Sequence, residues 1–262
     1  MDIRVSGSGP AGPFLGAGTL LETQCDLSLP VEVKIREDPD ERTLAAHYED
    51  RHELIISRKA ATSAMARELA LHELAHMVRY EDEHPSHTQS TEEALFLALA
   101  GQSVEQRKLT HCYQIANHMK DIYADDITLS VAPAEKFVGF FESQLAQAVA
   151  DRPRAYPGPA AEGERVDSRL LTSSADPEIT AVNAAFALAM VERHDLVSPS
   201  HRLYQLADVA DTDAPGVDLT AFKRRFERLA DDPSESEYRK ALVDVTRMYA
   251  TGADGPGGHA AD

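Results

Sequence analysis

The sequence has 262 residues, of which 43% are hydrophobic, so a chain that is disordered throughout is excluded. This length is enough for one sizeable core and a second, smaller helical unit. The chain has 26 Lys and Arg against 44 Asp and Glu, and its net charge of −18 excludes nucleic acid as an expected partner, because an acidic surface repels phosphate.

The N-terminal part is predicted to contain a small sheet followed by a long helix. Residues 1–30 are rich in Gly and Pro and are expected to be irregular. Residues 31–38 alternate apolar and polar side chains, as a half-buried strand does, and residues 52–58 form a second strand rich in β-branched side chains. A long helical stretch comes next, with Thr62 or Ser63 as its N-cap.

Helices fill the rest of the chain. They are expected near 94–100, 104–125, 134–151, 178–194, 199–210, 219–230 and 234–250. Asp176 followed by Pro177 is typical of a helix start. The fold class is therefore mostly α within α+β, with a small N-terminal sheet. The predicted divisions are a first domain at 1–151, a linker or long loop at 152–175, a helical C-terminal unit at 176–252 and a disordered tail at 253–262.

The compartment is expected to be the cytoplasm. No run of 18 apolar residues predicts a membrane span, and the N-terminus lacks a basic segment followed by an apolar one. Cys25 and Cys112 are far apart and fit neither a disulfide framework nor a CxxC metal site. The acid excess with only seven lysines resembles proteins of salt-loving archaea, in which concentrated salt screens self-repulsion, so we expect a halophilic protein.

A metal-binding motif lies in the long helix, where the sequence is Leu-His-Glu-Leu-Ala-His. His72 and His76 are four residues apart and therefore about 40° apart on a helix, so both imidazoles reach one ion. Glu73 is displaced around the helix, where it can act as a general base without binding the ion. The flanking residues are uncharged, as a helix buried on several sides requires: Ala70, Leu71, Leu74, Ala75, Met77 and Val78.

This motif after a strand resembles the zincin metallopeptidases of the gluzincin and aspzincin type, over about residues 50–126. In that family an edge strand precedes the active-site helix and binds extended substrate. The resemblance implies a zinc ion, a water activated by it and Glu73 as the general base. The whole chain also resembles an uncharacterised haloarchaeal family that carries the motif.

The third ligand has several candidates. A metzincin pattern would use Asp82, but Arg79 stands where that pattern needs Gly. The gluzincin pattern places an acid on a later helix with another acid four residues on, which matches Asp121 as ligand and Asp125 as the residue that fixes a histidine tautomer. His118 lies on the same helical face and is a competing ligand.

A glycine-rich segment, Gly7–Gly12, has the G-x-G-x-x-G pattern of dinucleotide-binding proteins. The helix that such a loop requires would contain Pro13, Gly16 and Gly18, and helix propensity argues against it. Nucleotide binding by this loop is kept as an alternative.

The function expected from the sequence is a zinc-dependent metallopeptidase that acts on a peptide or protein, with zinc as cofactor and with neither nucleic acid nor membrane as a partner. The ligands are His72, His76 and Asp121, and Glu73 is the catalytic base. A zinc-binding, non-hydrolytic protein whose helical part binds a partner is the other alternative.

Overall fold

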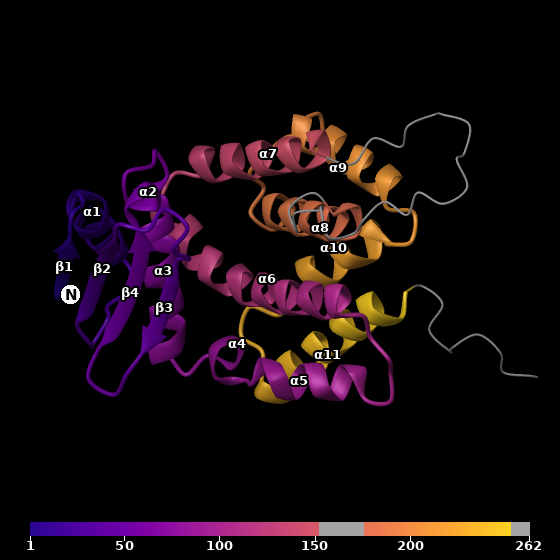
Figure 1. Cartoon of the computed structure of the whole chain (residues 1–262), viewed down its shortest axis with the longest axis horizontal. Coiled ribbons are helices and arrows are strands. Elements are labelled where there is room, and N and C mark those ends of the chain that lie inside the picture. The colour runs from indigo at the N-terminus through magenta and orange to yellow at the C-terminus, as the bar shows by residue number, and fades with distance from the viewer. Residues whose placement is uncertain (152–175, 253–262) are drawn as a thin grey trace, which may run out of the picture. The chain divides into compact units, whose positions relative to one another are not determined.

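The computed structural model describes residues 1–151 and 176–252 (Figure 1). The chain is mostly helical with a small N-terminal sheet, and the predicted fold class is confirmed. The predicted linker 152–175 and tail 253–262 lie outside the described residues. In the described part, no helix is both long and apolar enough to cross a membrane.

Residues cluster by contacts into two units, each drawn from separate stretches of the chain. The first contains 1–91, 117–137 and 231–239, and the second contains 92–116, 138–230 and the chain from 240 onward. The boundaries of the helices outside the sheet region are α4 (Pro85–Thr88), α5 (Thr91–Leu99), α6 (Gln106–Val131), α7 (Glu135–Ala150), α8 (Pro177–Arg193), α9 (Arg202–Asp213), α10 (Leu219–Glu227) and α11 (Glu235–Thr251). The helix at the predicted Asp176–Pro177 start is confirmed, because Asp176 caps it by accepting from the Glu178 N–H.

The sheet of the first unit has the strand order β1-β2-β4-β3 (Figure 1). Its strands are β1 (Ile3–Gly7), β2 (Val31–Arg36), β3 (Leu44–His47) and β4 (His52–Ser57). The first three in this order are mutually parallel, and β3 pairs antiparallel with β4. The two predicted strands are confirmed, but the strand at 52–58 is internal. The edge strands are β1 and β3, and β3 was not predicted from the sequence.

The prediction of an irregular segment at 1–30 is wrong, because it contains β1 and helix α1 (Gly12–Leu21). Burial outweighs the low helix propensity, since α1 packs against the helix that carries the motif and buries Phe14 and Leu21 completely. Gly18 lies against β1, where a Cβ would come within 2.5 Å of the Ile3 Cδ1.

The predicted helix with a Thr62 or Ser63 cap is two helices. Helix α2 (Arg58–Ala61) is capped by Ser57, whose hydroxyl accepts from the Ala60 N–H at 3.1 Å. Helix α3 (Ala66–Glu81) follows and carries the motif. Its predicted apolar flanks are confirmed as buried: Ala70, Leu71, Leu74, Ala75, Met77 and Val78. These side chains join the core of the sheet and fix the rotation of α3 about its axis.

Candidate metal centre

Helix α3 places both motif histidines on one face. The Nε2 atoms of His72 and His76 are 3.0 Å apart, and their rings are nearly perpendicular. Two neutral imidazoles with their Nε2 lone pairs facing each other at this distance would repel. The arrangement therefore requires a proton or a metal cation between the two nitrogens.

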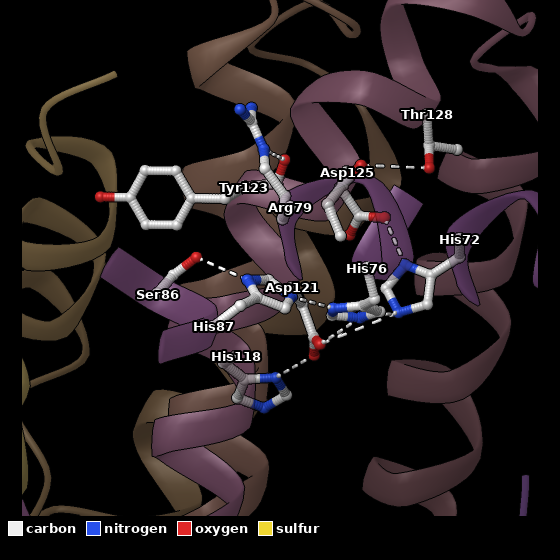
Figure 2. A network of polar contacts seen from close by, with 11 residues as sticks. His72, His76, Arg79, Ser86, His87, His118, Asp121, Tyr123, Asp125 and Thr128 are labelled. Atoms are coloured by element: carbon white, nitrogen blue, oxygen red, sulfur yellow. Dashed lines mark hydrogen bonds and ion pairs between the residues drawn. The ribbon is translucent and has the colours of Figure 1, made fainter. Parts of the chain in front are cut away.

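Asp121 of α6 completes a group of three ligand atoms (Figure 2). Its Oδ1 lies 3.3 Å from the His76 Nε2 and 3.8 Å from the His72 Nε2. Ligands of a tetrahedral zinc at 2.0–2.2 Å are separated by about 3.3–3.6 Å. The three atoms thus fit a single zinc ion and leave one coordination position for water or substrate.

Asp125 lies one turn further along α6, behind His72. Its Oδ1 is 2.7 Å from the His72 Nδ1, and its side chain is only 4% exposed. A neutral His72 donates its Nδ1–H to this carboxylate, which leaves Nε2 free to bind a metal. The structure therefore places Asp125 where the predicted orienting carboxylate belongs.

Arg79 links helix α3 to helix α6. Its Nε donates to the Tyr123 carbonyl oxygen at 2.9 Å, between the two acidic positions of α6 (Figure 2). The residue that interrupts the metzincin pattern thus connects the two helices of the site. Asp82 is exposed at the C-cap of α3 and is not part of the three-atom group, so the structure does not bring it to the candidate centre.

His118 lies beside Asp121 and not in the ligand group. Its Nδ1 is 3.6 Å from the Asp121 Oδ2, the oxygen turned away from the two histidines (Figure 2). This position suits a residue that orients Asp121. The competing assignment of His118 as ligand is not favoured by the geometry.

Glu73 is partly exposed on α3 between the two histidines. It forms no hydrogen bond or ion pair with any residue in the described ranges, and its negative charge acts on His72. A carboxylate that is close to the ligands but unpaired is available to exchange a proton with a water.

The electrostatics of the cluster favour a cation. Burial disfavours a charged His72, but Asp125 and Asp121 outweigh it and raise the pKa of His72 to about 10. Burial likewise favours a neutral Asp121, yet His118 and His76 hold its pKa well below the usual range. Burial raises the pKa of Asp125, with His72 opposing. In the absence of a metal, a proton on His72 supplies the positive charge that these carboxylates require.

His76 also contacts His87 of helix α4, which was not among the site residues predicted from the sequence. The His76 Nδ1 lies 2.7 Å from the His87 Nε2, and the His87 Nδ1 lies 2.7 Å from the Ser86 Oγ (Figure 2). Burial, assisted by the nearby His76 and Lys120, lowers the pKa of His87 to about 2, so its ring is neutral. The sequence has a second pair of histidines directly after α3, His84 and His87, but their spacing did not predict a metal site.

The Gly7–Gly12 loop connects β1 to α1, and α1 leads to the parallel strand β2. The expectation that no helix would follow this loop is therefore wrong. Packing accounts for two of its glycines: Gly7 has φ of +98° and a Cβ there would lie 2.2 Å from the Ile35 carbonyl oxygen, while a Cβ on Gly9 would lie 2.6 Å from the Ile35 Cδ1. These glycines are explained without a bound nucleotide.

A second cluster, in the other unit, combines His111, Asp176 and Glu178. Arg107 forms an ion pair with each of the two carboxylates, and His111 contacts the hydroxyl of Tyr249 at 2.5 Å. The guanidinium already supplies the cation that the carboxylates need. This cluster fixes the start of α8 to α6 and does not resemble an open metal site.

Fold and site together define a mostly helical α+β protein with a candidate metal centre of two histidines and one aspartate. The chain belongs to a family of unknown function, DUF5781, which matches residues 1–251. No curated protein and no solved structure is significantly similar to it.

Proposed function

We propose that the protein is a zinc-dependent metallopeptidase. The observation that carries the proposal is the convergence of His72 Nε2, His76 Nε2 and Asp121 Oδ1 within 3.0–3.8 Å of one another. Asp125 contacts the other ring nitrogen of His72, Nδ1. Two imidazoles and one carboxylate are the donor set of catalytic zinc sites, which retain one open position.

When bound, zinc would supply a Lewis acid that polarises a carbonyl and lowers the pKa of a water to about 7. Glu73 takes a proton from the attacking water and returns it to the leaving amine. Asp125 holds the His72 ring in its metal-binding tautomer, and Asp121 contributes the anionic ligand. These roles use the three carboxylates that act on His72, which are Asp125, Asp121 and Glu73.

The edge strand β3 supports an extended peptide as the substrate. Within the described residues, β3 pairs on one side only, with β4, so its other side can hydrogen-bond an added strand. His47 at the end of β3 stacks on Tyr80 of α3, with ring centroids 4.0 Å apart. Leu44 and Tyr48 at its ends are 56% and 45% exposed, and they offer apolar contacts to a bound peptide.

The cytoplasm remains the proposed compartment. Cys25 and Cys112 are both free thiols, as a reducing environment favours.

The test uses two variants and a general peptide library. His72→Ala should lose zinc, whereas Glu73→Gln should retain one zinc per chain and lose peptide cleavage. Cleavage that survives Glu73→Gln would refute the mechanism. Zinc binding by the wild-type protein with no cleavage of any peptide would favour the alternative, a zinc-binding protein that is not a hydrolase.

A further inference from the structure

His76, His87, Ser86 and His84 form a continuous chain of hydrogen bonds at the end of α3 (Figure 2 shows the first three). We propose that this chain is a one-way relay that sets the tautomer of His76, which makes His87 a positioning residue for the metal centre. The inference rests on the proposed function only in that His76 binds a metal.

The direction of the relay is set by a backbone group. The Ser86 N–H donates to the His84 Nδ1 at 3.2 Å, so this ring nitrogen carries no proton. The Ser86 Oγ lies 2.7 Å from the same nitrogen and must therefore donate its only proton there. The hydroxyl can then act only as an acceptor toward any other partner.

The remaining bonds follow from this constraint. At the 2.7 Å contact between Ser86 Oγ and His87 Nδ1, the imidazole must be the donor. A neutral His87 with a proton on Nδ1 has a lone pair on Nε2, which accepts from the His76 Nδ1–H at 2.7 Å. His76 is thereby left with a free lone pair on Nε2, the nitrogen that faces His72 and Asp121.

The far end of the relay is buried, which restricts its side chains. Ser86 is fully buried and His84 is 6% exposed. The chain reverses after α3 at Glu83, whose φ of 52° is in the left-handed region, and this turn brings α4 back against α3. At the far end, the His84 Nε2 is buried without a hydrogen-bond partner among the described residues, and the His84 ring packs at a tilt against Tyr123 with ring centroids 4.5 Å apart.

A neutral acceptor behind His76 also balances the charge. Asp121 and Asp125 together neutralise one divalent cation. A carboxylate in place of His87 would add a further negative charge to a partly buried site that already has Asp121, Asp125 and Glu73, which is costly. An imidazole locked as an acceptor orients His76 without that charge.

The first test is the protonation pattern of the ring nitrogens in full-length protein, measured from long-range proton–nitrogen NMR spectra with and without one equivalent of Zn²⁺. We expect a proton on Nδ1 of His87, on Nε2 of His84 and, with zinc bound, on Nδ1 of His76. A His87 protonated on Nε2 would overturn the relay.

The second test compares zinc affinities by chelator competition. His87→Leu removes the acceptor and should weaken zinc binding about 10- to 100-fold, whereas His87→Gln, which keeps an acceptor oxygen near the position of Nε2, should stay within about 3-fold of wild type. Thr88→Ala, exposed on the same short helix, is the matched control and should leave the affinity unchanged. Thermal unfolding of each variant checks that the fold is retained.

The outcomes separate the two claims. Equal zinc affinity of wild type, His87→Leu and His87→Gln would refute the relay and leave the metallopeptidase proposal intact. A wild-type protein that binds no zinc would refute both.

Discussion

The third ligand gives the sharpest test of the site, because the sequence left Asp121, His118 and Asp82 as candidates and the structure brings only Asp121 into the three-atom group with His72 and His76. We compare Asp121→Ala with Asp82→Ala. Asp121 Oδ1 is 3.3 and 3.8 Å from the two Nε2 atoms, whereas Asp82 is exposed at the end of α3. Each variant removes one carboxylate, so they differ only in the position from which the charge is lost.

The expected magnitude follows from the position of each carboxylate. Loss of a residue that only orients a ligand costs roughly 10- to 100-fold in metal affinity. Loss of a ligand should exceed that range, so Asp121→Ala should weaken zinc binding by more than about 100-fold, or about 2.7 kcal/mol. Asp82→Ala should remain within about 2-fold of wild type, because its interaction with the site is screened by solvent.

The assay is competition for Zn²⁺ against a chromophoric chelator, at fixed pH and salt. Circular dichroism of the zinc-free proteins checks that both variants are folded. If Asp82→Ala loses zinc while Asp121→Ala keeps it, the assignment of α6 as the source of the third ligand is refuted.

Three further predictions concern protonation, backbone packing and salt. In the zinc-free protein, His72 keeps its proton between about pH 6.5 and its raised pKa of about 10 only in the folded state, so the free energy of unfolding should fall as pH rises through this window. Asp125→Asn removes the main charge that raises this pKa and should make the dependence on pH weaker. Urea unfolding at several pH values measures both. Gly7→Ala should destabilise the fold by more than about 2 kcal/mol, because φ is +98° and the new Cβ would meet the Ile35 carbonyl. Gly12→Ala should be tolerated, because a Cβ at Gly12 has nothing within 4 Å. Equal unfolding midpoints of the two variants would contradict this. The net charge of −18 predicts unfolding at low salt and stability near molar KCl, and a melting temperature indifferent to KCl would remove the halophilic interpretation.

Much of the site was predictable because it is encoded in helical periodicity. Spacings of four residues place His72 with His76 and Asp121 with Asp125 on common faces, and the uncharged flanks of the motif predicted burial. The pairing of these two helices across 53 residues of sequence, seen in the His72–Asp125 contact, was expected from the resemblance to the gluzincin pattern and not from periodicity.

The features that were not predicted from the sequence mostly depend on tertiary contacts. Helix α1 forms despite Gly16 and Gly18 because burial against α3 outweighs propensity, and no local pattern reports that burial. Pro13 lies in the first turn of α1, where its missing N–H costs nothing. His87 reaches His76 only through the left-handed turn at Glu83. The edge strand β3 is four residues long and too short for its alternation to be recognised.

The most direct test of the central claim is a crystal structure of the protein grown with Zn²⁺, with anomalous scattering recorded at the zinc edge. A single peak about 2.0–2.2 Å from the His72 Nε2, the His76 Nε2 and an Asp121 oxygen is the predicted result. A protein that shows no peak at these three residues, or zinc bound only elsewhere on the chain, would contradict the metal centre and the function proposed from it.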